Sequence, residues 1–217
     1  MYKIALKILT KLNNMGYEAY IVGGFARDKY LGVFSNDIDI CTSATPDTIK
    51  KYFKIIKDNS KFGSVIIKEN NFEYEITTFR EDRYQDSRYP KVSFVKDLEK
   101  DLERRDFIIN TLCIDKNGDY VDKKGAIYDL DHKIITCVGN PNIKFNEDPI
   151  RILRAIRFAS KLGFSLSDDI NYAIDKQKSK LKNLSKSKIS LETDKILRLK
   201  NGKNMLKKFD LEDILYK

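Results

Sequence analysis

The sequence predicts an α/β head over about residues 1–140, followed by an all-helical extension. In the head, the strand-like run Ile21-Val22-Gly23-Gly24 leads into a short helical stretch that Gly32 stops. The segment Asp37-Ile38-Asp39-Ile40 then alternates carboxylates with isoleucines, which is typical of a strand with one buried face. From about residue 145 the apolar residues recur at helical spacing instead.

Local signals place the first elements of the head. Residues 3–15 have apolar side chains at helical spacing, and residues 18–22 form a predicted strand that ends at the two glycines. A short helix is expected from Phe25 to Leu31. The stretch Thr45-Pro46-Asp47 offers an N-cap and a proline in the first turn, so a helix from about 46 to 54 follows.

The rest of the head contains two turn signals. Residues 64–69 and 72–79 form a predicted hairpin across Asn70-Asn71, and Asn117-Gly118 predicts a second tight turn. The polar segment 82–91 contains Pro90 and is expected to be a loop. Residues 108–115 fit either a strand or a helix.

The extension is predicted to consist of helices. The strongest amphipathic pattern covers residues 148–161 and ends at Gly163. Further helices are expected over about 167–180 and 190–200, with weaker helical character over 205–215.

Composition narrows the class of partner. Lysine and arginine outnumber the acidic residues, so the formal net charge is +9, which favours a polyanionic partner. The three cysteines are widely spaced and odd in number, which indicates a reduced, cytoplasmic protein rather than a disulfide framework or a cysteine metal cluster. No apolar run reaches the length of a membrane span, so no membrane partner is expected.

The aspartate pair and the glycines together point to chemistry on phosphates. Asp37 and Asp39 should project from the same strand face, where they repel each other unless a cation such as Mg²⁺ lies between them. The amides of Gly23 and Gly24 suit phosphate oxygens. Taken singly, such features are usually a solvated strand edge and a plain turn. Together they predict phosphoryl or nucleotidyl transfer, and the lack of a G-x-G-x-x-G pattern argues against a Rossmann cofactor site.

Further charged residues could complete such a site. Glu75 lies between apolar residues on a predicted strand and is a candidate general base or outer neighbour of the metal, or an ordinary exposed glutamate. Arg104-Arg105-Asp106 offers planar guanidinium groups to a triphosphate or RNA backbone, or forms a surface ion pair. Asp148 and Arg151, three residues apart on a predicted helix, can read one base edge, or form a helix-surface salt bridge.

These pieces match a known family. The chain resembles the class II tRNA nucleotidyltransferases, the CCA-adding enzymes and bacterial poly(A) polymerases of the polymerase-β superfamily. The order and spacing of the motifs hold from about residue 5 to 198. The matching stretches are Val22-Gly23-Gly24-Phe25-Ala26-Arg27-Asp28, Asp37-Ile38-Asp39, Glu75-Ile76-Thr77-Thr78-Phe79-Arg80, Asp101-Leu102-Glu103-Arg104-Arg105-Asp106-Phe107 and Glu147-Asp148-Pro149-Ile150-Arg151.

The resemblance implies a nucleotidyltransferase head with a mixed β-sheet over residues 1–140. In that head, Asp37 and Asp39 would bind two Mg²⁺ ions, with Mn²⁺ as an alternative. Gly24 and Arg27 would hold the phosphates or sugar of the incoming nucleotide. Arg105 would help to bind it, and Asp106 would brace the site.

The resemblance also implies a nucleotide-selecting helical neck over residues 141–217. Asp148 and Arg151 would pair with the base of CTP or ATP, and Arg154 and Arg157 would support that helix and the triphosphate. Residues 81–91 would be the flexible loop that permits the switch from C to A addition.

The length departs from the family. The chain ends soon after Ser190-Leu191-Glu192, where the neck of the family passes into helical body and tail domains that grip tRNA. The expectation is therefore a minimal enzyme, a truncated chain or half of a split enzyme. A second copy or a partner subunit could then replace the missing tRNA-binding domains.

The predicted function is Mg²⁺-dependent, template-independent addition of CCA, from CTP and ATP, to the 3′ acceptor end of tRNA. Addition of CC only, of A only, or of poly(A) are rivals that share the same motifs. A non-catalytic RNA-binding module is a further alternative, against which the intact Asp37 and Asp39 pair argues. A lysine cluster over 178–188 either contacts the acceptor stem or is a solvated face.

Overall fold

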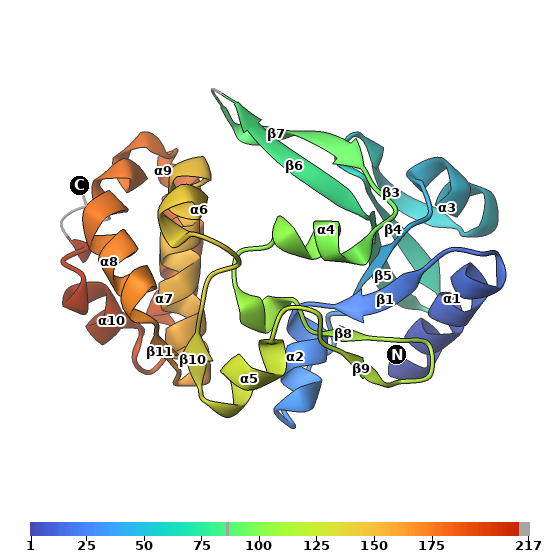
Figure 1. The fold of residues 1–217 in the computed structure, drawn as a ribbon, viewed down its shortest axis with the longest axis horizontal. Coiled ribbons are helices and arrows are strands. Elements are labelled where there is room, and N and C mark those ends of the chain that lie inside the picture. The colour runs from blue at the N-terminus through green and yellow to red at the C-terminus, as the bar shows by residue number, and fades with distance from the viewer. Residues whose placement is uncertain (86, 213–217) are drawn as a thin grey trace. The chain divides into compact units, whose positions relative to one another are not determined.

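The computed structural model describes residues 1–85 and 87–212. It divides into two compact units (Figure 1). Unit 1 comprises residues 1–105 and 109–127, and unit 2 comprises residues 106–108 and 128–217. The expected division into a head of residues 1–140 and a neck of residues 141–217 stays a prediction.

Unit 1 contains a seven-stranded sheet in the order β3-β4-β5-β2-β1-β8-β9. Strands β2 and β5 pair in parallel, whereas the other neighbours in this sheet pair antiparallel. The sheet is therefore mixed, as the family resemblance implied. Its strands are β1 (Ala19–Val22), β2 (Asp39–Thr42), β3 (Ile55–Asn59), β4 (Ser64–Glu69), β5 (Phe72–Thr78), β8 (Cys113–Ile114) and β9 (Tyr120–Val121).

Helices of unit 1 cover this sheet and lead into its strands. The first helix, α1 (Tyr2–Asn14), buries its apolar stripe of Ala5, Ile8, Leu9 and Leu12 and contacts β1. Helix α2 (Gly24–Tyr30) follows β1 directly, and α3 (Pro46–Tyr52) follows β2. The Thr45 hydroxyl caps α3 by accepting the Thr48 N–H at 3.3 Å, which confirms the predicted cap. Helix α4 (Leu98–Glu103), which the sequence analysis did not predict, begins at Asp97 as its N-cap.

The predicted hairpin across Asn70-Asn71 is confirmed. Both asparagines have positive φ angles, 45° and 65°, as a tight turn between antiparallel strands requires. The turn sets the register of β4 and β5, in which Ser64 faces Thr77. Asparagine tolerates this backbone region better than most residues other than glycine, so the turn follows from local sequence.

The predicted loop over residues 82–91 is wrong, because this segment is mostly strand, whereas the implied role of residues 81–91 as a flexible element in the switch from C to A addition stays a prediction. Strands β6 (Arg80–Gln85) and β7 (Ser87–Phe94) form a separate two-stranded antiparallel sheet. Pro90 lies within β7, and a strand of a two-stranded sheet can hold a proline because one of its sides has no strand neighbour. Polarity misled the prediction because a two-stranded ribbon at the surface needs few apolar residues.

Unit 2 is mainly helical. Helix α7 (Ile150–Leu162) contacts α9 (Lys186–Leu197) and α10 (Gly202–Lys208), while α6 (Pro141–Glu147) contacts α8 (Asp168–Gln177). Gly163 takes the left-handed conformation that ends α7, as predicted. The expected all-helical extension also holds a strand that was missed, since β10 (Ile134–Ile135) pairs in parallel with β11 (Ser165–Leu166). Residues 213–215 of the predicted last helix lie outside the described residues.

One helix boundary needs correction. Helix α7 begins at Ile150 rather than at residue 148, and Asp148 before it is extended, with φ −145° and ψ 102°. Pro149 explains the shift, because proline disfavours helical backbone at the residue before it. Helix α5 (Ala126–Asp131) lies where the two units divide.

Among the described helices, none combines the length and the apolar character needed to cross a membrane.

Candidate active site

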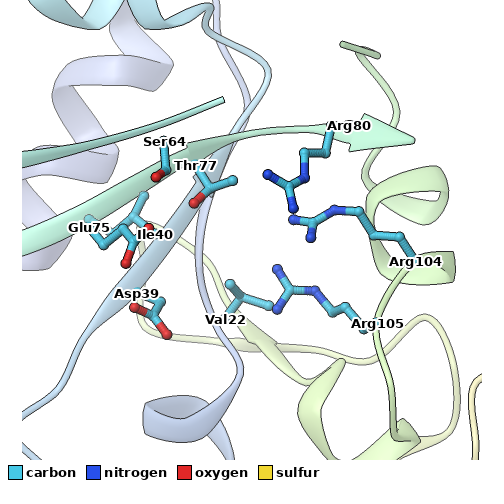
Figure 2. Close-up of a pocket in the computed structure, with 9 residues that line it drawn as sticks. All are labelled: Val22, Asp39, Ile40, Ser64, Glu75, Thr77, Arg80, Arg104 and Arg105. Carbon is cyan, nitrogen blue, oxygen red and sulfur yellow. The ribbon is translucent and has the colours of Figure 1, made fainter. Parts of the chain in front are cut away.

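Asp39 and Glu75 lie side by side on the central strands of unit 1. Asp39 opens β2 and is in register with Glu75 of β5, its parallel neighbour. Residues in register on adjacent strands share a face, and Figure 2 shows both carboxylates at one pocket. The strand prediction for Glu75 is thereby confirmed, and the fold brings it beside one of the predicted aspartates.

The alternation of acids and isoleucines is confirmed, although the strand is shorter than expected. Ile38 and Ile40 are 2% and 1% exposed, whereas Asp37 and Asp39 reach the surface. The prediction that Asp37 lies in the strand is wrong, because β2 begins only at Asp39. Asp37 nevertheless lies close enough to act electrostatically on Asp39.

The Asp39 carboxyl has an unusual proton affinity. Its pKa is raised to about 6, and partial desolvation by the surrounding protein atoms is the largest cause. The negative charges of Asp37 and Glu75 also raise the pKa, and Arg105 opposes them. A site that repels negative charge in this way is stabilised by a bound cation.

Three arginines face these carboxylates across the pocket (Figure 2). Arg80 begins β6, and Arg104 and Arg105 follow α4 directly. These arginines therefore place positive charge in the same pocket as the acidic pair Asp39 and Glu75. The pocket is lined by Val22, Asp39, Ile40, Ser64, Glu75, Thr77, Arg80, Arg104 and Arg105.

The glycine turn lies beside this pocket. Gly23 has φ 79°, a conformation that favours glycine, and it caps α2. A Cβ atom at Gly23 would lie 3.7 Å from Nη1 of Arg105, so the turn and this arginine are close neighbours. At Gly24 a Cβ atom would lie 3.8 Å from Nη2 of Arg27.

Arg27 is held by protein groups in the interior of unit 1. Its side chain is 3% exposed. Its Nε and Nη2 donate to Oδ1 of Asp28 at 2.8 and 2.6 Å, and Nη1 donates to Oδ1 of Asn110 at 2.6 Å. These contacts fix α2 against the segment that leads into β8, so the geometry gives Arg27 a structural role. Its implied contact with a nucleotide stays a prediction.

The carboxylates of the site fit a divalent cation whose remaining ligands come from a bound nucleotide. Asp37 and Asp39 supply carboxylate oxygens, which Mg²⁺ prefers. Within residues 1–85 and 87–212, no group of three or more His, Cys, Asp or Glu is arranged to hold a metal ion by itself. Phosphate oxygens of a nucleotide could supply the remaining ligands, as in many Mg²⁺ sites that act on phosphates.

The remaining predicted residues lie in unit 2. Asp106 accepts from Nε of Arg154 at 2.6 Å, and also from the backbone N–H of Phe107 at 2.9 Å. Burial lowers the pKa of the Arg154 guanidinium less than the charge of Asp106 raises it, so the net shift is upward. The pair joins the start of unit 2 to α7, which is consistent with a bracing role for Asp106.

Asp148 and Arg151 do not lie on one helix as expected, because Asp148 precedes α7, and their reading of one base edge stays a prediction. One of the carboxylate oxygens of Asp148 accepts the Ile150 N–H at 3.3 Å. Arg151 donates from Nη1 to Oε2 of Glu147 at 2.9 Å and to the Lys144 carbonyl at 3.2 Å. Further along α7, Nε of Arg157 donates to Oε2 of Glu192 on α9 at 2.8 Å.

The sequence reasoning did not single out Ser64, Thr77 and Arg80 as pocket residues. Ser64 and Thr77 face each other on β4 and β5, so a hairpin register could have placed them together. Arg80 followed a segment predicted to be a strand and preceded one predicted to be a loop, which hid its position. Arg104 was noted only as part of the Arg104-Arg105-Asp106 run.

The mixed sheet, with adjacent carboxylates opposite three arginines, is that of a nucleotidyltransferase fold. Comparison with known proteins makes this specific. The chain belongs to the poly(A) polymerase head domain family, whose model matches residues 19–136.

Similar proteins are named CCA-adding enzymes. The one from Ligilactobacillus salivarius is 44% identical over 219 residues, which cover 100% of this chain and 54% of the relative. The crystal structure of the Bacillus stearothermophilus CCA-adding enzyme in complex with CTP matches with a TM-score of 0.89 and 37% identity, over 95% of this chain and 52% of that one. The Thermotoga maritima CCA-adding enzyme complexed with tRNA_CCA gives a TM-score of 0.77 and 26% identity, over 95% and 50% of the two chains. The chain thus spans about half the length of the relatives it matches.

Proposed function

We propose that this chain holds the nucleotidyl-transfer centre of a CCA-adding tRNA nucleotidyltransferase. It would use CTP and ATP to extend the 3′ end of tRNA and release pyrophosphate. The observation that carries the proposal is the pocket in which Asp39 and Glu75, in register on β2 and β5, face three arginines. The similarity to a CCA-adding enzyme in complex with CTP supports the choice of substrate.

Asp37 and Asp39 are the proposed holders of Mg²⁺, with two ions expected and Mn²⁺ as a substitute. When bound, such ions lower the pKa of the attacking hydroxyl and neutralise charge on the triphosphate. The raised pKa of Asp39, caused first by desolvation and then by Asp37 and Glu75, supports this assignment. In the folded protein a cation would relieve the repulsion among these acids.

The arginines and the glycine turn are proposed to hold the triphosphate. A guanidinium group donates two parallel hydrogen bonds to phosphate oxygens, so Arg105 can fix both the charge and the orientation of a nucleotide. The amides of Gly23 and Gly24 would add backbone donors beside Arg105. In the proposed reaction the RNA 3′ oxygen attacks the α-phosphorus, and the bond to the leaving pyrophosphate breaks. Glu75 would accept the hydroxyl proton.

Asp148 and Arg151 are the proposed readers of the base. A carboxylate accepts from the amino group of cytosine or adenine, and an arginine donates to ring acceptors on the same edge. The contacts of Arg151 with Glu147 and the Lys144 carbonyl would hold its guanidinium in place. The pairs Arg154–Asp106 and Arg157–Glu192 would hold α7 within unit 2.

The test is incubation of the chain with Mg²⁺, labelled CTP or ATP, and tRNA transcripts that lack CCA, CA or A. We expect three, two or one nucleotides to be added, after which addition stops. Addition of CC only, or of A only, would assign a partial-addition enzyme, and a long ladder of A would assign a poly(A) polymerase. No product from a folded chain that binds tRNA would favour the non-catalytic alternative.

A further inference from the structure

Asp101 connects the three arginines of the pocket. It lies on α4, and its side chain is 0% exposed. Its Oδ1 accepts from Nε of Arg104 at 2.8 Å and from the backbone N–H of Arg80 at 3.1 Å, and it forms an ion pair with Nη2 of Arg104 at 2.8 Å. Its Oδ2 accepts from Nη2 of Arg105 at 3.1 Å. One buried carboxylate therefore contacts every arginine that lines the pocket.

Burial of a carboxylate is unfavourable unless its charge and lone pairs are satisfied. Asp101 meets this condition with three hydrogen-bond donors, two of them on charged side chains, and with the ion pair to Nη2 of Arg104. Two arginines share this one carboxylate, so the cluster of Asp101, Arg104 and Arg105 keeps a net positive charge. That charge faces Asp39 and Glu75 across the pocket (Figure 2).

The contacts restrict where the two guanidinium groups can point. An arginine side chain has several rotatable bonds, and binding a ligand through it is weaker when those bonds must first be ordered. Arg104 is fixed through two nitrogens and Arg105 through one. The Nε of Arg105 is buried, and it finds no acceptor among the described residues. Donors left without a protein acceptor are tolerated mainly where they serve a function, and a bound ligand could supply one here.

We propose that Asp101 is a positioning residue, which holds Arg104 and Arg105 ready for the phosphates of the incoming nucleotide. This inference rests on the proposed function. Asp101 does not reach the substrate, and it acts through the two arginines. The electrostatics agree: burial lowers the pKa of Arg105, but the charge and hydrogen bond of Asp101, together with the effects of Cys41 and Cys113, outweigh it, for a net upward shift.

The test compares Asp101→Asn with Asp97→Asn. Asparagine keeps the shape of Asp101, removes its charge and replaces one acceptor with a donor. Asp97 is an exposed aspartate on the same helix that caps the Glu99 N–H at 2.8 Å, a role asparagine also fills, so it is the matched control. For Asp101→Asn we expect the KM for CTP to rise by about tenfold to a hundredfold, because misplaced binding groups weaken productive contacts. For Asp97→Asn we expect a change within about twofold.

The KM for CTP separates positioning from a purely structural role. A variant that merely unfolds in part loses kcat per total protein but keeps the KM of its folded fraction. An unchanged KM in a folded Asp101→Asn variant would overturn the proposal.

A second measurement decides the case in which Asp101→Asn does not fold or the native chain does not bind CTP. Hydrogen exchange at arginine Nε, followed by nitrogen NMR on the native chain, should be much slower at Arg104 than at the exposed Arg198. Equal rates would overturn the proposal whatever the nucleotide results are. If exchange at Arg104 is slow but the native chain neither binds CTP nor extends tRNA, the proposed function fails while Asp101 remains the residue that orders the arginines.

Discussion

Asp39 is the side chain on which the main electrostatic effects of the candidate site in unit 1 act. It has a pKa near 6 because desolvation, Asp37 and Glu75 all disfavour its charged form, while Arg105 acts the other way. A group in this state gains from a nearby cation, and the pocket presents arginines for the phosphates that would accompany one. At the scale of single residues, the acids and the arginines are therefore complementary parts of one site.

Replacing Asp37 tests the metal assignment. Asp37→Ala should lower nucleotide addition by at least about a hundredfold if it removes a group that stabilises the reacting phosphates. Because Asp37 is exposed and precedes β2, the free energy of unfolding should change by less than about 0.5 kcal/mol. Primer extension and thermal unfolding measure the two effects. Glu73→Ala, at an exposed acid of β5, is the control, and retained activity in Asp37→Ala would refute the assignment.

Replacing Arg151 tests base selection. Arg151→Ala removes the charged contact with Glu147 and should destabilise unit 2 by about 1–3 kcal/mol. We expect the ratio of CTP to ATP incorporation to change more than the total affinity for triphosphate. Competition between the two nucleotides on one tRNA transcript measures the ratio. A preference equal to that of the native chain would count against a role in reading the base.

Contacts between elements decide how α7 is held. Arg157 on α7 and Glu192 on α9 form an ion pair at 2.8 Å, and Lys195 adds a second contact to Glu192 at 2.8 Å. Desolvation alone would raise the pKa of Glu192. The hydrogen bond from Lys195 and the charge of Arg157 outweigh it and lower the pKa. The ionised form of Glu192 thus favours the folded state.

This shift predicts acid sensitivity at the level of these helices. Because the pKa of Glu192 is lower in the folded than in the unfolded state, its contribution is present above the unfolded value of about 4.3 and is lost as the pH falls through the folded value. Unfolding by urea at a series of pH values should show Glu192→Gln less stable than the native chain at neutral pH. The difference should shrink below about pH 4. A difference that does not vary with pH would contradict this account.

Secondary structure was predicted well where local signals are strong. The cap at Thr45, the turn at Asn70-Asn71 and the end of α7 at Gly163 all appear as expected. The β6–β7 ribbon was missed because its residues are mostly polar and carry little periodicity, and β11 was missed because it is only two residues long. Pairing with a neighbouring strand creates such elements, and no local pattern records that pairing.

For the whole molecule, the net charge of +9 is an electrostatic property that suits an RNA partner. If the chain binds tRNA mainly through phosphates, affinity should fall steeply with salt, by about a thousandfold between 50 and 200 mM for six or more phosphate contacts. Filter binding at several salt concentrations measures the slope. As a control, an uncharged competitor that contains no tRNA should not alter this slope. A flat salt dependence would exclude phosphate contacts as the main source of affinity.

The sequence by itself determined the family, the alternation that exposes Asp37 and Asp39 beside buried isoleucines, and most elements with strong caps or turns. These follow from local periodicity and from motifs, which the chain carries in its linear order. Only the tertiary structure decided that Glu75 lies in register with Asp39, that Arg80 joins the pocket, and that Asp101 holds Arg104 and Arg105. Strand register joins residues that are distant in sequence, so packing fixes it and no local pattern can. The spacing of Asp101 to Arg104 and Arg105 is a local helical spacing, but the burial of Asp101 and its contact with the Arg80 N–H depend on packing.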